Sequence, residues 1–343
     1  MKSIGILTGG GDCPGLNSVI RAIVRRGLIE NYKILGIKNG WKGLLDKDVV
    51  NLDIDSVSGI LHRGGTILRT SRTNPYKSEG EIQKVVDNFE SLGFDALIPI
   101  GGEDTLGVAA KLYRDFKLPV IGVPKTIDND ISGTDFTFGF DTAVNIAMEC
   151  IDKLHTTAES HNRVMVVEVM GRHAGWIALY AGLAGGADAI LIPEKPIDMD
   201  QVCSLIKKRH SRGKDFSVVV VAEGAKFKRG ADVVQDDNLD SFGHIKLGGI
   251  GQQVADRLEE KTGYETRVTV LGHIQRGGSP TAYDRILGTR YGIRAFELVN
   301  DGRFGRVVVL KGNEISDIPI KDVLGKLKTV DDKIYSIAAT FFG

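Results

Sequence analysis

The chain has 343 residues, of which 42% are hydrophobic and 26% are charged. This length suits two α/β domains better than one compact core. The 44 basic and 44 acidic residues cancel, so no overall positive field attracts nucleic acid or an anionic membrane. No apolar stretch approaches the ~20 residues that a membrane-spanning helix requires. We therefore expect neither a nucleic-acid partner nor a membrane partner.

Short apolar runs rich in Val, Ile and Leu alternate along the chain with amphipathic stretches. The apolar runs predict buried parallel strands at Ile4–Leu7, Ala96–Ile100, Pro119–Val123, Val164–Val169, Ala189–Ile192, Ser217–Ala222, Val268–Leu271 and Val307–Leu310. The amphipathic stretches predict helices at Gly15–Leu28, Glu79–Leu92, Thr105–Asp115, Thr142–Thr157, Ala174–Ala184, Met199–Arg212, Ile250–Lys261 and Ala282–Val299. Such alternation is typical of a doubly wound α/β fold, which binds its ligands at the carboxyl ends of the strands.

The loop at Gly133–Phe140 predicts a domain boundary near residue 140. We expect a larger domain at residues 1–140, a smaller one at 141–275, and a helix and strand at 276–343 that return across both. The polar, aperiodic stretch Lys226–Gly243 predicts a surface loop.

The three cysteines and the N-terminus bear on the compartment. Cys13, Cys150 and Cys203 are scattered and fit no metal-ligand spacing, which suits a reducing environment. The N-terminal apolar run is too short for a signal peptide and instead predicts the first strand. We expect a cytoplasmic protein.

Glycines and carboxylates follow the first two predicted strands of the larger domain. Thr8–Gly15 contains three consecutive glycines and opens a helix, so its backbone could approach an anion or could form only a structural turn. Gly101-Gly102-Glu103-Asp104-Thr105 follows the second strand. One carboxylate would be enough to cap the helix, so the adjacent pair favours a site that holds Mg²⁺ against substrate phosphates.

Three further loops combine cations with acids or glycines. Pro124–Asp130 holds Lys125, Thr126, Asp128 and Asp130, which suits phosphoryl transfer but also an Asx-rich turn. Two arginine-bearing loops follow later strands, in the sequences Met-Gly-Arg-His at residues 170–173 and Gly-His-Ile-Gln-Arg-Gly-Gly at residues 272–278. Arginine beside glycine at a strand end favours phosphate binding over a solvated surface role.

Together these segments resemble the phosphofructokinase family over roughly residues 3–310. The matching stretches are Leu7–Gly15, Arg63–Thr66 with Arg72, Gly101–Thr105, Pro124–Asp130, Val167–Arg172 and Gly263–Pro280. The resemblance implies two similar Rossmann-like domains with the active site in the cleft between them. It also implies Mg²⁺ as cofactor, fructose 6-phosphate as substrate and a homodimer or homotetramer.

The resemblance assigns roles position by position. Asp128 would be the base that deprotonates the sugar 1-hydroxyl, and Arg172 with Arg72 would stabilise the phosphoryl group in flight. Gly11 would approach the donor phosphates and Glu103 would hold the metal. The implied sugar-phosphate site comprises Thr126, Ile127, Asp128, Met170, Gly171, Arg172, Glu223, His273, Ile274, Gln275 and Arg276, with Arg163 and Arg267 reaching the 6-phosphate from a neighbouring subunit.

Two positions depart from the commonest ATP-using pattern of the family. Asp104 and Lys125 stand where that pattern has glycines. A carboxylate at position 104 would fill the room beside the α-phosphate of ATP and repel that anion. Lys125 would bring a positive charge to the shorter donor that remains. Both changes match the pyrophosphate-dependent branch, so we expect pyrophosphate as donor and count Asp104 and Lys125 among the catalytic residues.

Other functions remain compatible with the sequence. The nearest alternative is an ATP-dependent phosphofructokinase, and more distant ones are an NAD-kinase-like enzyme and a subunit that only binds sugar phosphate. Bacterial ATP-using relatives also bind effectors in a basic pocket between subunits. Arg21 and Arg25 match two arginines of that pocket, whereas Ile54 and His155 replace two others. We therefore expect weak effector binding or none.

Overall fold

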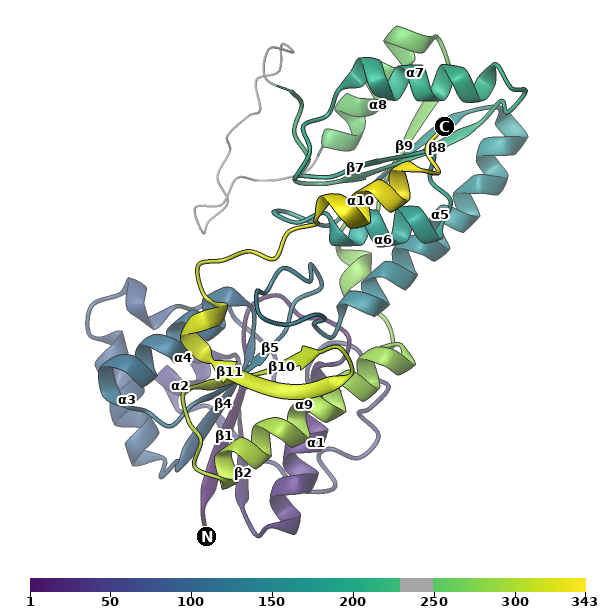
Figure 1. The fold of residues 1–343 in the computed structure, drawn as a ribbon. Helices are drawn as coiled ribbons and strands as arrows, with labels where there is room; N and C mark the ends of the chain where they lie inside the picture. Colours follow the sequence, from purple (N-terminus) through teal and green to yellow (C-terminus); the bar gives the residue numbers. More distant parts are fainter. Residues whose placement is uncertain (229–248) are drawn as a thin grey trace. The chain divides into compact units, whose positions relative to one another are not determined.

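A computed structural model describes residues 1–228 and 249–343 of the chain. The chain divides into two compact units (Figure 1). Unit 1 consists of Met1–Thr142 and Arg276–Lys326, and unit 2 of Ala143–Gln275 and Leu327–Gly343. The segment after residue 275 thus contributes to both units. Most of the predicted surface loop at Lys226–Gly243, from residue 229 onward, lies outside the described residues.

Unit 1 is built on a seven-stranded sheet with the order β11-β10-β5-β4-β1-β2-β3. Its strands are β1 (Ser3–Thr8), β2 (Lys33–Ile37), β3 (Val49–Asn51), β4 (Ala96–Gly101), β5 (Ile121–Pro124), β10 (Arg306–Lys311) and β11 (Glu314–Pro319). The central strands run parallel, and the outer pairs β2–β3 and β10–β11 are antiparallel. The predicted strands β1, β4, β5 and β10 are confirmed, while β2, β3 and β11 were not predicted.

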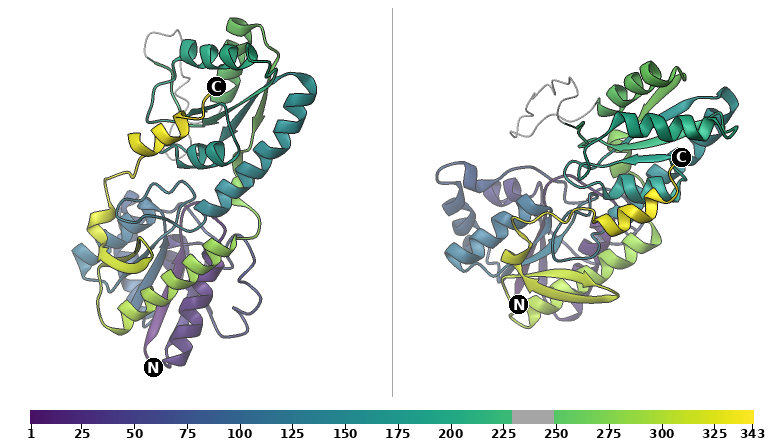
Figure 2. Two further views of the ribbon diagram at one scale, coloured as in Figure 1. Left: turned by 45° about the vertical axis from the view of Figure 1, so that its right-hand side comes forward. Right: turned by 45° about the horizontal axis from the view of Figure 1, so that its top comes forward.

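The helices of unit 1 cover both faces of this sheet. They are α1 (Leu16–Ile29), α2 (Trp41–Asp46), α3 (Glu81–Ser91), α4 (Glu103–Phe116) and α9 (Ala282–Asn300), with the short 3₁₀ helices η1 (Pro75–Lys77) and η3 (Ile320–Val323). Helices α1 and α9 lie side by side on one face (Figures 1 and 2). Their close approach requires glycine at position 292, because a Cβ there would lie only 2.6 Å from the carbonyl oxygen of Val19.

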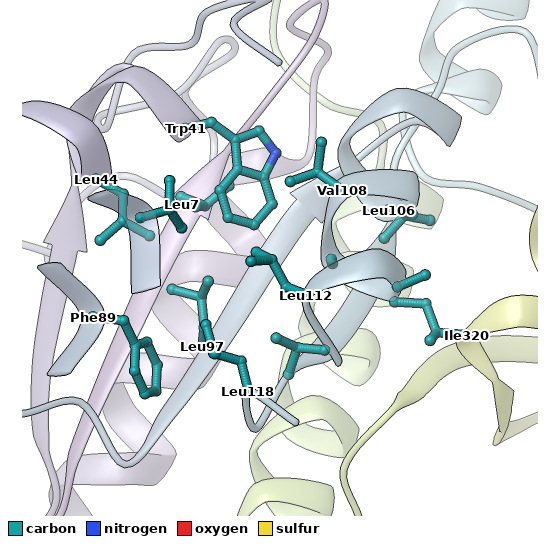
Figure 3. Packing of buried hydrophobic residues seen from close by; sticks show 14 of the residues in the cluster. Leu7, Trp41, Leu44, Phe89, Leu97, Leu106, Val108, Leu112, Leu118 and Ile320 are labelled. Carbon is teal, nitrogen blue, oxygen red and sulfur yellow. The ribbon is translucent and has the colours of Figure 1, made fainter. Parts of the chain in front are cut away.

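The other face of the sheet carries the apolar core shown in Figure 3. Leu7 and Leu97 project from the strands toward Trp41 and Val108, which come from α2 and α4. The labelled residues Leu44, Phe89, Leu106, Leu112, Leu118 and Ile320 complete this part of the cluster. Burial of this apolar surface holds β1 and β4 rigidly, and the loops that follow these two strands carry the candidate residues.

Unit 2 has a four-stranded parallel sheet with the order β7-β8-β6-β9. Its strands are β6 (Val164–Val169), β7 (Ala189–Leu191), β8 (Ser217–Ala222) and β9 (Thr266–Val270). Its helices are α6 (Trp176–Ala184), α7 (Met199–His210), α8 (Ile250–Thr262) and α10 (Asp332–Ala339), with η2 (Gly272–Arg276) at its end and the long α5 (Phe140–His161) at its start.

One expectation for unit 2 needs correction, and one helix was missed. Strand β9 was predicted to be buried, but it lies at the edge of the sheet and Val270 is 58% exposed. The C-terminal helix α10 was not predicted, and with eight residues it is too short to give a clear helical periodicity. Among the described residues, no helix combines the length and the apolar character needed to cross a membrane.

Candidate active site

Three candidate loops of unit 1 follow neighbouring strands and are hydrogen-bonded to one another. The amide of Gly9 donates to the carbonyl of Ile100 at 2.9 Å, which joins the ends of β1 and β4. The amide of Lys125 donates to the carbonyl of Gly101 at 2.9 Å, which joins the ends of β4 and β5. The sheet order β5-β4-β1 therefore brings the predicted donor, metal and base residues to one edge of unit 1.

Glycine is required where these loops meet. A Cβ on Gly9 would lie 2.4 Å from Oγ1 of Thr105, and a Cβ on Gly101 would lie 2.5 Å from the same atom. Two backbones thus converge on one threonine side chain at the start of α4. We call Gly9–Gly11 the glycine turn. The packing of Thr105 explains why positions 9 and 101 are glycines.

A second segment runs beside the glycine turn. Thr70 Oγ1 donates to the carbonyl of Gly10 at 2.6 Å, and the Gly10 amide donates to the carbonyl of Ser71 at 3.0 Å. Arg72, one of the predicted phosphoryl-stabilising arginines, follows directly and is exposed. Because residues 70 and 71 are hydrogen-bonded to Gly10, the backbone of Arg72 starts next to the glycine turn.

Lys125 lies beneath the glycine turn. Its side chain is buried, with 4% exposure, and its Nζ donates a hydrogen bond to the carbonyl oxygen of Gly11. Burial lowers the pKa of Lys125, while the thiol of Cys13 and the carboxylates of Asp12 and Asp128 act in the opposite direction. When protonated, Lys125 places a buried positive charge next to the Gly11 carbonyl.

Glu103 and Asp104 form the first turn of α4, and both are exposed. Glu103 Oε1 accepts a hydrogen bond from the amide of Gly325 at 2.9 Å. The N-cap residue Gly102 has no side chain, so neither carboxylate occupies the usual capping position. Both carboxylates also lie at the positive end of the helix dipole, where negative charge is stabilised.

The loop that carries Asp128 is braced by hydrogen bonds. Thr126 Oγ1 accepts from the amide of Asp128 at 3.1 Å, and Thr137 Oγ1 donates to the carbonyl of Thr126 at 2.7 Å. Asn129 has a left-handed backbone (φ 52°), and its Oδ1 accepts from the amide of Thr137 at 3.1 Å. Asp128 is half-buried within this fixed turn. Ile127 is only 1% exposed, so the structure does not present it to a ligand.

In unit 2, three loops meet in the same way at the carboxyl ends of β8, β6 and β9. The amide of Glu223 donates to the carbonyl of Val169 at 2.8 Å, and the amide of Gly224 donates to the carbonyl of Gly171 at 3.1 Å. From the other side, Gln275 Oε1 accepts from the amide of Met170 at 3.3 Å. The predicted residues on these loops therefore lie together in unit 2.

Arg163 and Arg267 lie at the opposite end of that sheet. Arg163 precedes β6, whereas Met170 and Arg172 follow it. Both arginines pair with Glu265, and the Arg163 contact measures 2.8 Å. Hydrogen bonding to Arg163 lowers the pKa of Glu265. A six-residue strand spans roughly 20 Å, so these arginines are remote from the loops at the carboxyl ends of the same unit.

The chain is similar to known proteins along almost its whole length. A family model described as phosphofructokinase matches residues 3–299. The pyrophosphate–fructose 6-phosphate 1-phosphotransferase of Streptomyces coelicolor is 57% identical over 341 residues, which are 99% of each chain. The chain belongs to the phosphofructokinase family. Another family member, the ATP-dependent 6-phosphofructokinase 3 of the same organism, is 52% identical over 336 residues, or 98% of each chain.

The fold is also that of known phosphofructokinases. The structure of phosphofructokinase from Saccharomyces cerevisiae matches with a TM-score of 0.81 and 31% sequence identity. The match covers 99% of this chain and 47% of the yeast chain, so this protein spans about half the length of that one. The predicted two-domain α/β phosphofructokinase fold is confirmed.

The structure divides one run of residues that the family motif presents as a single pocket. His273, Ile274 and Gln275 belong to unit 2, whereas Arg276 belongs to unit 1. Arg276 Nη1 donates to the carbonyl of Asp12 at 3.3 Å, and its guanidinium lies where a side chain on Gly11 would be. Arg276 thus contacts the glycine turn, which its place in a sugar-phosphate motif did not predict.

The remaining members of the motif differ in exposure. Gln275 is fully buried and holds the backbone of Met170, whereas His273 and Ile274 are exposed. Sequence reasoning assigned no role to Asp12 or Thr105, although both lie within quoted motifs. Thr105 packs against two glycines. Burial lowers the pKa of Lys125 whereas the Asp12 carboxylate raises it, and the Asp12 carbonyl accepts from Arg276. Their position next to glycines was the available signal.

Proposed function

We propose that this protein is a cytoplasmic enzyme that transfers a phosphoryl group from pyrophosphate to the 1-hydroxyl of fructose 6-phosphate. The products are fructose 1,6-bisphosphate and phosphate, and the reaction is reversible. The observation that carries the choice of donor is the buried Lys125 ammonium on the Gly11 carbonyl, together with Asp104 on the neighbouring helix turn. The 57% identity to a relative named for the same reaction supports it.

Asp104 and Lys125 act on donors of different length. Lys125 supplies a fixed positive charge under the glycine turn, where the phosphates of a short donor would lie. Asp104 adds a carboxylate at the start of α4, where a longer donor would place a further phosphate. The carboxylate of Asp104 would repel that further phosphate. A nucleoside triphosphate is therefore disfavoured, while pyrophosphate, which lacks this phosphate, is accepted.

The chemistry requires a base for the acceptor and cations for the moving group. Asp128 would accept the proton of the sugar 1-hydroxyl as its oxygen attacks the near phosphorus of the donor. The bond from that phosphorus to the bridging oxygen breaks, and orthophosphate leaves. Arg172, Arg72 and Lys125 would stabilise the charge on the phosphoryl group in flight. The braced loop of Asp128 keeps the carboxylate oriented for this step.

The acceptor would be held mainly by the loops of unit 2. The set comprises Met170, Gly171, Arg172, Glu223, His273, Ile274 and Gln275, with Thr126, Ile127 and Arg276 from unit 1. Arg163 and Arg267 would bind the 6-phosphate of a sugar in a neighbouring subunit of a homodimer or homotetramer. Their place at the amino end of the sheet, remote from the loops at its carboxyl end, supports a role outside their own site.

Mg²⁺ would be held by Glu103 together with oxygens of the donor. Among residues 1–228 and 249–343, no group of three or more His, Cys, Asp or Glu side chains is arranged to hold a metal. One carboxylate together with the phosphate oxygens of pyrophosphate suits Mg²⁺, which keeps several waters and usually takes one or two carboxylates plus substrate phosphates. When bound, the ion would neutralise charge on the donor phosphates.

The alternative is an ATP-dependent enzyme, which the 52% identity to a relative of that name favours. A donor assay separates the two. Purified protein with Mg²⁺ and fructose 6-phosphate should form fructose 1,6-bisphosphate with pyrophosphate much faster than with ATP. Orthophosphate with fructose 1,6-bisphosphate should give a measurable reverse reaction. Robust turnover with ATP and none with pyrophosphate would support the alternative and reject the proposal.

A further inference from the structure

Glu194 connects two parts of unit 2 that are far apart in the sequence. We call Met170–Gly175 the acceptor loop and Leu327–Gly343 the C-terminal segment. Glu194 Oε1 accepts hydrogen bonds from the amide of Gly175 at 3.0 Å and from the amide of Val330 at 2.8 Å. Its Oε2 accepts a second contact from the Gly175 amide at 3.2 Å. The half-buried carboxylate is thus shared between the loop and the segment.

The contact to Gly175 caps a helix. Gly175 is the N-cap of α6, and it has no side chain to satisfy the first free amides of the helix. A Cβ on Gly175 would lie 2.4 Å from Cβ of Ile192, so no capping residue fits at this position. Glu194, on the loop after β7, instead accepts from the amide of the N-cap residue itself, and its charge complements the positive end of the helix dipole.

The same contact fixes the far end of the acceptor loop. The near end is already held, because Gly224 donates to the carbonyl of Gly171 and Met170 donates to Gln275. Only three residues, with Arg172 first among them, separate this anchored end from Gly175. A displacement of Gly175 therefore passes to Arg172, because so short a segment has little freedom to absorb it.

The C-terminal segment lies along the first turn of α6. Nε1 of Trp176 donates to the carbonyl of Lys328 at 2.7 Å, two residues before Val330. Farther along, helix α10 lies next to α6 in Figures 1 and 2, and the hydroxyl of Tyr335 donates to the carbonyl of Ile190 at 3.0 Å. Glu194 therefore connects the C-terminal segment directly to the acceptor loop through its hydrogen bonds to Val330 and Gly175.

We propose that Glu194 is a positioning residue that links the C-terminal segment to the acceptor loop and thereby sets the affinity for the sugar phosphate. The inference rests on the proposed function, since it takes Arg172 and Met170 as acceptor-binding residues. It adds a residue that touches no substrate. It also gives the last residues of the chain a role in the acceptor site.

The test compares Glu194→Ala, Glu194→Gln and a matched control. The control is Lys195→Ala, because Lys195 is the next residue and also ties to the C-terminal segment, through a 2.8 Å ion pair with Asp332. Fructose 6-phosphate binding is measured by calorimetry without any donor, and KM and kcat are measured for both substrates. Glu194→Ala should raise the Kd and KM for fructose 6-phosphate about tenfold, because a displaced acceptor loop would lose about one charge-assisted hydrogen bond to the sugar phosphate.

The KM for pyrophosphate should stay unchanged in Glu194→Ala, because the donor loops belong to unit 1. Glu194→Gln should recover part of the sugar affinity, since its amide oxygen still accepts from Gly175, and Lys195→Ala should bind like the wild type. Native sugar affinity in Glu194→Ala, or a lower kcat with both KM values unchanged, would overturn the inference. If Glu194→Ala does not fold, native affinity in Glu194→Gln overturns it and reduced affinity supports it. Wild-type protein that binds no fructose 6-phosphate would instead refute the proposed function.

Discussion

Asp104 and Lys125 differ sharply in their surroundings, although each replaces a glycine of the ATP-using pattern. Lys125 is buried and bonded to the Gly11 carbonyl, whereas Asp104 is exposed in the first turn of α4. Removing Lys125 would leave the Gly11 carbonyl without its donor and would disturb the glycine turn itself. Asp104 is therefore the residue at which donor choice can be altered with little damage to the fold.

We predict that Asp104→Gly binds ATP at least about tenfold more tightly than the wild type, because both charge and bulk beside the nucleotide are removed. Calorimetric titration with Mg–ATP measures this. Asp104→Asn is the matched variant, because it removes the charge and keeps the bulk. If Asp104→Asn gains as much as Asp104→Gly, charge alone excludes the nucleotide. No gain in either variant would show that other residues exclude it.

Asp128 offers a second test at the level of one residue. Asp128→Asn should lower kcat by a factor on the order of 10²–10⁴, the usual contribution of a general base. The KM for fructose 6-phosphate should change much less, because the lost interaction belongs to the transition state. Initial rates over a range of both substrates give these values.

Asp130→Asn is the control for Asp128, since Asp130 is a carboxylate two residues farther along the same loop. It should keep most of the activity. A variant at position 128 with near-normal kcat, together with a severe loss at position 130, would reassign the base to Asp130.

At the scale of elements, helices α5 and α9 are tied together at their N-termini. Asp284 in the first turn of α9 accepts from the amide of Thr142 at 2.8 Å and from its hydroxyl at 2.5 Å. In return, Thr281, the N-cap of α9, donates its hydroxyl to Asp141 at 2.5 Å. Asp284 is fully buried, and this burial raises its pKa to about 6.

This raised pKa predicts that the free energy of unfolding decreases as the pH rises. The folded protein binds the Asp284 proton more tightly than the unfolded chain, whose ordinary value is 3.8. The contribution of Asp284 is therefore most favourable below about pH 4 and is lost as the pH rises to about 6. Above that range the free energy of unfolding is lower by about 3 kcal/mol than it would be with a neutral group.

Asp284→Asn should remove this dependence, because an amide oxygen still accepts from Thr142 but carries no charge. Denaturant unfolding at pH 4 and pH 7.5 measures it. Relative to the wild type, the variant should gain about 3 kcal/mol of unfolding free energy between the two pH values. Asp141→Asn is the control, because Asp141 accepts from Thr281 in the other hydrogen bond between the N-termini of α5 and α9. An identical pH dependence in Asp284→Asn and wild type would show that Asp284 is not the group responsible.

At the scale of the whole molecule, the question is whether effectors control the enzyme. Arg21 and Arg25 lie on α1 and match two arginines of the effector pocket of bacterial ATP-using relatives. Of the two replaced positions, Ile54 is half exposed and cannot bind phosphate. The other, His155, places its Nε2 2.6 Å from the carbonyl oxygen of Gly185 within unit 2. Two bidentate phosphate partners are therefore missing.

We predict hyperbolic saturation with fructose 6-phosphate that ADP and phosphoenolpyruvate leave unchanged below millimolar concentrations. The physical reason is the loss of two guanidinium groups, which shifts an effector held at micromolar affinity to the millimolar range or weaker. Initial rates at several effector concentrations test this. A sigmoidal curve that becomes hyperbolic with submillimolar ADP would contradict it.

The sequence alone determined the central strands, most helices and the family. Strands such as Val164–Val169 were predictable because strands buried on both faces are continuous apolar runs, a property of neighbouring residues. Strands β3 and β11 were missed because they lie at the antiparallel ends of the sheet and lack that pattern. Strand β2 was missed although its residues 34–37 are buried. The loops with Gly11, Glu103 and Asp128 were found from composition at strand ends.

The tertiary structure decided which of these loops are joined and which hydrogen bonds join them. The hydrogen bonds that bring Lys125 to Gly11, Arg276 to Asp12 and Glu194 to Val330 connect residues that are more than a hundred positions apart. No local pattern encodes such pairs, because each depends on the strand order and on the backbone path between them. The sequence therefore supplied the chemical groups, and the order of the strands in each sheet determined which groups meet.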